Sequence, residues 1–249
     1  METRWACIAA SDQTRLAAQL SSYFNDPGIY LAVFEFPDLD RPHEEVLGRD
    51  GYFTQIIGKR VVTWVNNSLA RIQPDHIILL GLSDASASYI HAVLPAERLV
   101  VVDTEAQLLA LPFAAGKPEP LKCKPSQAIE GLLRAKSQNV PLAFSENAPD
   151  LPCQKLDGKA GLILLENAFD IGEVATINYA ASIDADVVIV PEVQREEIQS
   201  LPRQLQAWSK DRSSPALRET RKKITKRIEG LDFTKYQFAT FFPLVCLMG

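Results

Sequence analysis

The chain has 249 residues, of which 47% are hydrophobic and 23% are charged, and its net charge is -5 at pH 7. This length is enough for one large α/β domain or two small ones, with a sizeable buried core. The acidic balance argues against a protein that grips nucleic acid over its whole surface.

The cysteines and the apolar runs indicate the compartment. Cys7, Cys123, Cys153 and Cys246 form no C-x-x-C pair and have no histidine at metal-like spacing, so we expect no structural zinc site. The N-terminus lacks the apolar core of a signal peptide, and no apolar run reaches the ~18 residues needed to span a bilayer. We therefore expect a cytoplasmic protein with reduced thiols and no membrane partner.

The first third of the chain alternates between strand and helix patterns. Trp5–Ala10 is short and apolar, which fits a strand or the lead into a helix, and Ser11 is suited to cap the helix after it. Ile29–Phe36 is rich in aromatic and β-branched residues, which predicts a central strand. Apolar residues then recur three and four apart over Phe53–Ile72, which predicts a long amphipathic helix that Pro74 ends.

The clearest unit of the chain is His76–Glu105, in which an apolar strand, a polar turn, a short helix and a second apolar strand follow one another. We expect the two strands at Ile77–Leu80 and Leu99–Val102. Ser83 or Asp84 caps the helix between them, because serine and aspartate side chains accept hydrogen bonds from the free N–H groups of a first helical turn.

The rest of the chain repeats this pattern after an interruption. Pro112–Pro125 contains four prolines and a glycine, which predicts a linker or an excursion of the chain. Ser126 is suited to cap the helix that follows. We also expect strands at Gly161–Leu165 and Val187–Val190, with a helix over Asp170–Ile183 between them. The last predicted elements are a short strand at Pro141–Phe144, a helix that opens at Ser214-Pro215 and ends at Gly230, and an apolar strand within Tyr236–Leu247.

Short strands that are apolar on both faces, separated by helices, predict an α/β fold with three layers and a mostly parallel, Rossmann-like sheet. The segments ILLGLSDASASYI…LVVVDTE and ILLENAFDIGEVATI…VVIVPE follow the same plan, so two similar β-α-β halves are an alternative. We expect one α/β domain over residues 1–249, with 1–111 and 126–249 as sub-halves if the proline-rich segment joins two.

The first candidate site is the turn from Gly81 to Ser86, which leaves a strand and enters a helix. Gly81, Ser83, Asp84 and Ser86 would lie around a helix start, where N–H groups attract phosphates. Asp103 ends the next strand and is suited to hold ribose hydroxyls. However, G-x-G-x-x-G and G-x-x-x-x-G-K-[ST] are both absent, and Asp84 would repel an anion. A well-capped helix in an α/β protein explains the same residues.

The second candidate is a set of acids that follow strands, because the carboxyl ends of parallel strands share one sheet edge. Carboxylates on that edge would hold Mg²⁺ or act as acid and base, although acids after strands also commonly cap helices. Glu166, Asp170 and Glu192 are the candidate catalytic residues. The wider set of acids also includes Asp38, Asp103 and Glu173.

Two further segments would suit macromolecular partners. Leu217–Leu231 contains six Lys or Arg and two Glu, a local charge of +4, and offers the only candidate surface for nucleic acid. A solvated helix face is the more ordinary interpretation. The apolar segment FATFFPLVCLMG at the C-terminus predicts a protein partner or self-association if it is not a buried strand.

These patterns leave three functional hypotheses. The first is a module that binds a nucleotide or another phosphorylated small molecule at the Gly81–Ser86 turn, which would suit a regulatory role and requires no catalysis. The second is a metal-assisted hydrolase or transferase that uses the carboxylates of the sheet edge, with Mg²⁺ as its ion. The third is a non-catalytic scaffold subunit of a larger assembly.

Overall fold

A computed structural model describes residues 4–25, 31–40, 51–152, 156, 158–167, 170–191, 222, 226, 229 and 235–242. The chain divides into two compact units. Unit 1 is chiefly Met1–Lys155 with Phe169–Ser182, and unit 2 is chiefly Leu156–Ala168 with Ile183–Leu247. Each unit has its own parallel sheet. The expectation of one domain over the whole chain stays a prediction.

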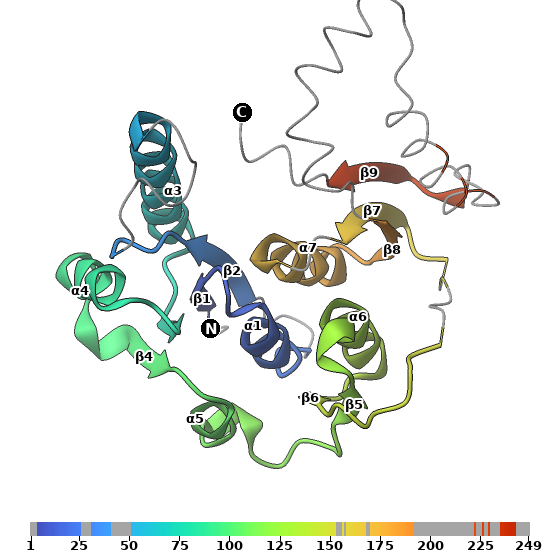
Figure 1. Ribbon diagram of the computed structural model, residues 1–249. Helices are drawn as coiled ribbons and strands as arrows, with labels where there is room; N and C mark the ends of the chain where they lie inside the picture. Colours follow the sequence, from blue (N-terminus) through green and yellow to red (C-terminus); the bar gives the residue numbers. More distant parts are fainter. Residues whose placement is uncertain are drawn as a thin grey trace, which may run out of the picture. The chain divides into compact units, whose positions relative to one another are not determined.

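The main sheet of unit 1 has four parallel strands in the order β2-β1-β3-β4 (Figure 1). The strands are β1 (Trp5–Ala10), β2 (Leu31–Phe36), β3 (His76–Leu80) and β4 (Leu99–Val102). Ile8 in the middle of β1 pairs with Phe34 on one side and with Leu79 on the other. Most side chains of β1, β2 and β3 are buried, as expected for strands that are covered on both faces.

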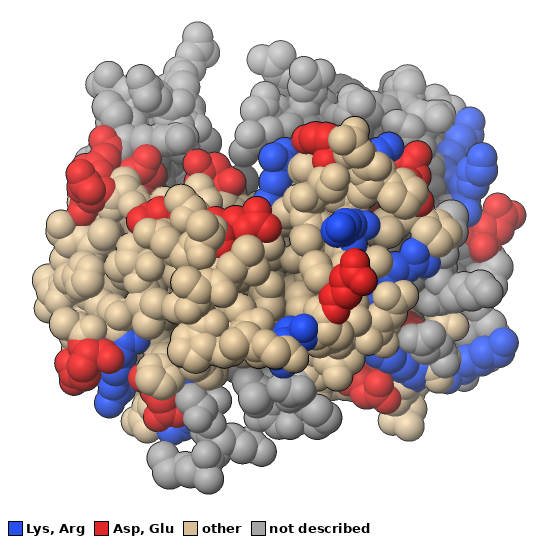
Figure 2. Space-filling view, turned by 90° about the horizontal axis from the view of Figure 1, so that it is seen from below, with Lys and Arg blue, Asp and Glu red and all other residues tan. Residues whose placement is uncertain are grey.

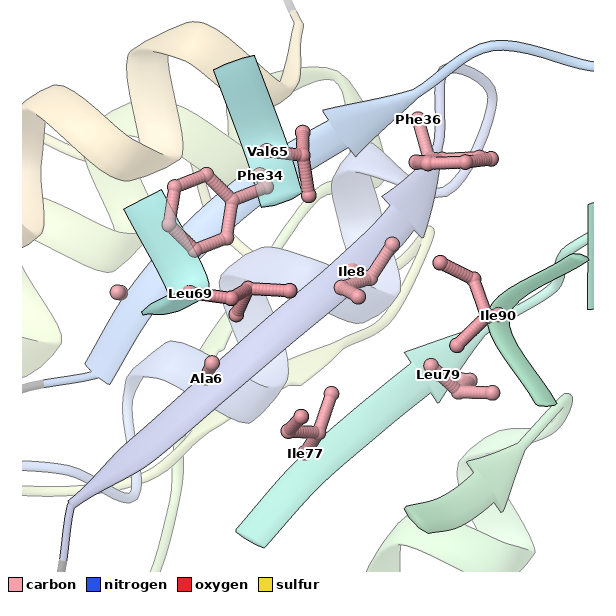
Figure 3. Close-up of a cluster of buried hydrophobic side chains, with 10 residues drawn as sticks. Ala6, Ile8, Phe34, Phe36, Val65, Leu69, Ile77, Leu79 and Ile90 are labelled. Atoms are coloured by element: carbon pink, nitrogen blue, oxygen red, sulfur yellow. The ribbon is translucent and has the colours of Figure 1, made fainter. Parts of the chain in front are cut away.

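Helices α3 (Gly51–Ile72) and α4 (Asp84–Val93) cover one face of this sheet. Val65 and Leu69 of α3 and Ile90 of α4 pack on alternate residues of the strands, as Figure 3 shows. The buried cluster comprises Ala6, Ile8, Ala32, Phe34, Phe36, Val65, Leu69, Ile77, Leu79 and Ile90. The predicted amphipathic helix therefore turns its apolar stripe to the sheet.

Helices α1 (Thr14–Ser21) and α7 (Ile171–Ser182) lie on the opposite face (Figure 1), where α7 packs on β2 and α1. Asn178 of α7 joins these elements, because its Nδ2 donates to Ser21 Oγ at 3.1 Å and to Leu31 O at 3.2 Å. Helix α5 (Glu105–Leu109) follows β4, and the Oε1 atom of Glu105 accepts from Gln19 Nε2 at 2.6 Å. The predicted three-layer, mostly parallel, Rossmann-like α/β fold is confirmed.

A small lobe attaches to α1 within unit 1. Strands β5 (Leu121–Cys123) and β6 (Leu142–Phe144) form a parallel pair, and α6 (Ala128–Gln138) between them packs on α1 and α7. The Nζ atom of Lys136 on α6 lies 3.0 Å from Ser21 O, 3.2 Å from Phe24 O and 3.3 Å from Asn25 Oδ1. Lys136 thereby donates to carbonyl groups at and just after the C-terminus of α1, where Ser21 O also accepts from Phe24 N at 3.1 Å.

Three local expectations from the sequence are corrected. The N-cap of α1 is Gln13 and not Ser11, because Gln13 N donates to Ala10 O and the intervening residues form a turn. Ser126 lies in the 3₁₀ turn η3 (Pro125–Gln127), so α6 starts later without a side-chain cap. Strand β2, predicted to be central, lies at the edge of its sheet, and its apolar residues are covered because α3 and α7 pack on it. The proline-rich segment, predicted to be a linker or an excursion, contains the turn η2 (Pro112–Ala114) and strand β5.

The sheet of unit 2 has three parallel strands in the order β8-β7-β9. They are β7 (Gly161–Asn167), β8 (Ala185–Pro191) and β9 (Phe238–Phe242), which confirms the strands predicted at those places. Asp186 of β8 is buried, and its Oδ2 atom accepts from the backbone N–H groups of Gly158 and Lys159 at 2.9 and 3.1 Å. The 3₁₀ turn η1 (Ala96–Arg98) completes the described elements.

No helix within the described ranges is long and apolar enough to cross a membrane.

Candidate functional site

The order of the strands places a topological switch point between β1 and β3. The chain passes from β1 to β2 on one side and then returns to β3 on the other. The helix that follows β1 and the helix that follows β3 cover opposite faces of the sheet, so the two loops diverge. Ligands of open α/β sheets bind in such a crevice, outside the carboxyl ends of the strands.

A small hollow of about 150 Å³ lies at this point. Its walls come from the last residues of β1 and β2 and from the residues that follow β1, β2 and β3. The lining residues are Ala10, Ser11, Asp12, Phe36, Pro37, Asp38, Gly81, Leu82, Ser83 and Ser86. Sites for drug-sized ligands usually enclose about 300–1,000 Å³, so this hollow suits a phosphate-sized group or a hydrated ion, and the rest of a larger ligand would lie outside it.

The hollow is acidic. Asp12 and Asp38 are the charged residues of the described lining, which contains no Lys or Arg. Asp12 Oδ1 accepts from Gln13 Nε2 at 3.1 Å, and Asp38 Oδ1 accepts from the backbone N–H of Asp40 at 3.0 Å. Two carboxylates favour a cation or a hydrogen-bond donor and disfavour a bare anion. The sequence argument had included Asp38 but had missed Asp12, which follows a strand whose nature was ambiguous.

Gly81 meets a geometric requirement at the switch point. Its φ of +54° lies in the left-handed region, and a Cβ added there would sit 2.6 Å from the Cδ atom of Gln13. Gln13 belongs to the loop after β1, so the two loops that diverge at the crevice touch at this glycine. A side chain at position 81 would be strained by this backbone conformation and would force the Gln13 side chain aside.

Ser83 is the N-cap of α4, as predicted. Its Oγ atom accepts from Ser86 N at 3.5 Å and donates to Ser86 Oγ at 2.9 Å. The backbone N–H of Ala85, in the same first turn of the helix, also has a partner, because it donates to Asp40 Oδ2 at 3.0 Å. The carboxylate of Asp40 therefore lies where the sequence analysis had expected a ligand phosphate. Asp40 comes from the loop after β2, 45 residues earlier in the chain, and no local pattern pointed to it.

Gly81, Ser83 and Ser86 of the predicted binding set line the hollow, whereas Asp84 and Asp103 do not. Asp84 is exposed in the first turn of α4. Asp103 is exposed after β4, where its backbone N–H donates to Gln107 Oε1 at 2.6 Å. This bond belongs to the start of α5, which Thr104 and Gln107 close with a capping box.

The candidate catalytic acids are not brought together within the described residues. Glu166 is in β7 and pairs with Val190, but its side chain and the whole of Glu192 lie outside them. Asp170 stands before α7, where its Oδ1 accepts from Glu173 N at 3.0 Å and Glu173 Oε2 accepts from Asp170 N at 2.9 Å. This reciprocal arrangement is a capping box.

Replacing Asp170 with alanine is therefore expected to lower the free energy of unfolding by about 1 kcal/mol, because the first turn of α7 loses its cap. Urea unfolding measures the change. Glu173→Gln is the matched variant, since an amide at this position keeps an oxygen acceptor for the bond back to the cap. If Asp170→Ala leaves stability unchanged, the capping role is wrong and the candidate catalytic role gains weight.

Other chemical groups offer less. In the described part of the chain no group of three His, Cys, Asp or Glu side chains could hold a metal ion by itself. Burial raises the pKa of the Cys7 thiol, and burial followed by the charge of Glu130 raises the pKa of Cys123 to about 11. Both thiols are thus held in their unreactive protonated form.

The candidate partner surfaces fall largely outside the described residues. Of Leu217–Leu231 only Lys222, Lys226 and Glu229 are described, and the chain after Phe242 is not. On the face that Figure 2 shows, the acidic and basic side chains of the described residues are dispersed among uncharged ones. Binding of nucleic acid or of a protein partner stays a prediction.

Comparison of the chain with known protein families, curated proteins and solved structures finds no match.

Proposed function

We propose that this protein is a binding module for a nucleotide or another phosphorylated small molecule, which docks at the hollow between β1 and β3 as its Mg²⁺ complex. The observation that carries the proposal is the acidic hollow at the topological switch point. Ligands of open α/β sheets bind at this position. The two carboxylates of the hollow favour a ligand group that carries a positive charge.

The magnesium ion follows from that charge. Asp12 and Asp38 would repel a free phosphate, and Asp40 already engages an N–H group at the start of α4. Mg²⁺ is commonly held by one or two carboxylates together with substrate phosphates and water. A pair of acids without a third ligand therefore suits an ion that arrives with the phosphates.

The alternative hypotheses rest on less. Metal-assisted hydrolysis or transfer would use Glu166, Asp170 and Glu192, of which Asp170 caps α7. A scaffold role would use the C-terminal apolar segment and the basic helix, which lie mostly outside the described residues. Binding at the hollow needs neither set.

A thermal-shift titration tests the proposal. We expect a panel of nucleoside di- and triphosphates, each with an excess of Mg²⁺, to contain a ligand that raises Tm. A ligand at about 100 times its Kd stabilises the folded state by about 2.7 kcal/mol, which is roughly 5–10 °C for a chain of this size. The same ligand with EDTA should give little shift.

Variants locate the binding. Asp12→Asn and Asp38→Asn are expected to weaken the Mg²⁺-dependent shift, whereas Asp150→Asn should not, because Asp150 pairs with Lys124 on the surface and is not part of the hollow. Absence of a shift with every phosphorylated ligand, or an equal shift in Asp12→Asn, Asp38→Asn and wild type, would contradict the proposal.

A further inference from the structure

We infer that Ser86 is a positioning residue that acts on the ligand through Asp38. The Gly81–Ser86 turn would thus hold the Asp38 carboxylate, which belongs to the loop after β2, in the position where it binds the ligand. This role rests on the proposed function, because it concerns the same hollow. It differs from the role expected from the sequence, in which the turn itself would contact the ligand.

Ser86 forms hydrogen bonds to the backbone on both sides of Asp38. The side chain of Ser86 is buried, with 1% of its residue surface exposed. Its Oγ atom donates to Pro37 O at 2.9 Å and accepts from Leu39 N at 3.0 Å. These are the peptide groups on either side of Asp38, so a single buried hydroxyl holds the backbone of that residue at both ends.

A second chain of bonds reaches the carboxylate itself. Ala85 N donates to Asp40 Oδ2 at 3.0 Å, and Asp40 N donates to Asp38 Oδ1 at 3.0 Å. The start of α4 thus orients Asp40, and the backbone of Asp40 orients the side chain of Asp38. Residues next to a metal ligand commonly tune it in this way, by fixing its direction and its acceptor strength.

The hydrogen bonds matter here because the loop that carries Asp38 is not held in place by a buried apolar side chain at Leu39. Leu39, the large apolar residue next to Asp38, is 38% exposed. Burial of this side chain does not hold the loop in place, so the hydrogen bonds to Ser86 and Ala85 carry that task. Ser86→Ala removes the donor and the acceptor together and leaves Pro37 O and Leu39 N without their partner.

The experiment compares Ser86→Ala with Thr104→Ala by titration calorimetry, using the nucleotide that stabilises the wild-type protein most. Both variants lose a hydroxyl at a helix start, but Thr104 caps α5 and lies outside the hollow. We expect Ser86→Ala to weaken Mg²⁺-nucleotide binding by about tenfold and to raise the Mg²⁺ concentration needed for half-saturation. Thr104→Ala should bind as tightly as wild type.

Asp40→Ala is a second variant, chosen because Asp40 is exposed and its replacement is compatible with folding. It should weaken binding in the same direction. A measurement without ligand completes the test: amide hydrogen exchange at Leu39 should become faster in Ser86→Ala and stay unchanged in Thr104→Ala, because only the first variant removes the acceptor of that N–H.

The outcomes separate the two ideas. A wild-type protein that binds no Mg²⁺-nucleotide overturns the proposed function, whatever Ser86 does. If wild type binds and Ser86→Ala binds equally well, the positioning role of Ser86 is overturned and the proposed function stands. The same holds if wild type binds and amide exchange at Leu39 is equally fast in Ser86→Ala and in wild type.

Discussion

Replacing Gly81 with alanine is expected to lower the free energy of unfolding by about 2–3 kcal/mol. A left-handed backbone costs an L-residue about 1–2 kcal/mol, and φ at Gly81 is +54°. Moving the Gln13 side chain aside adds about 1 kcal/mol, the low end for overpacking, because the new Cβ would lie 2.6 Å from Gln13 Cδ and 2.7 Å from Gln13 Cγ. Urea unfolding of the two proteins measures the difference.

Gly116 is the matched control for the backbone contribution. Its φ is +72°, and no heavy atom of the described residues lies within 4 Å of an added Cβ. Gly116→Ala should therefore cost only the left-handed strain, about 1–2 kcal/mol. Gln13→Ala should abolish the excess cost of Gly81→Ala over Gly116→Ala. Equal costs for the two glycine variants would show that Gln13 does not press on Gly81.

Replacing Lys136 with methionine is expected to cost about 1–3 kcal/mol at pH 7. The ammonium group contacts Ser21 O, Phe24 O and Asn25 Oδ1, and a thioether removes this shared donor. Ser21 O then keeps only the bond from Phe24 N. Methionine keeps the length and flexibility of the side chain, so the loss reports on the polar contacts. Lys122→Met, at an exposed position of β5, should change stability by less than about 0.5 kcal/mol.

The cost of Lys136→Met should also depend on pH. Burial lowers the pKa of Lys136 from 10.5 to about 8. Between these two values the unfolded chain holds the proton and the folded chain does not, so unfolding takes up a proton and stability rises with pH. Wild type should gain stability relative to Lys136→Met from pH 8 to pH 10.5, by up to about 3 kcal/mol. A difference that is flat or falls over this range would contradict a lowered pKa.

The elements of the fold were predictable where local patterns and tertiary packing agree. Leu99–Val102 was predicted with its exact bounds, since apolar residues there stop at Asp103 and begin after Arg98. The helix over α3 followed from its apolar period. The start of α1 was not predictable in the same way, because Ser11 is a good cap by composition and only the turn from Ala10 to Gln13 rules it out.

The site was predictable in part, for a related reason. Gly81, Ser83 and Ser86 belong to one strand-turn-helix segment, which a local pattern can locate at the sheet edge. Asp12 and Asp40 come to that edge through the strand order β2-β1-β3-β4, which depends on long-range pairing. Local reasoning therefore found the turn and could not see that Asp40 already binds its helix start.

The assignment of α7 has a consequence for synthesis. Helix α7 belongs to unit 1, whereas β7 before it and β8 after it belong to unit 2. On the ribosome, β1, β2 and α1 emerge well before the helix that donates from Asn178 to Ser21 and Leu31. At about 5–20 residues per second, the nascent sheet waits some seconds for that cover. Unit 1 therefore cannot finish folding until α7 has been synthesised, because the N-terminal segments alone lack the helix that covers β2.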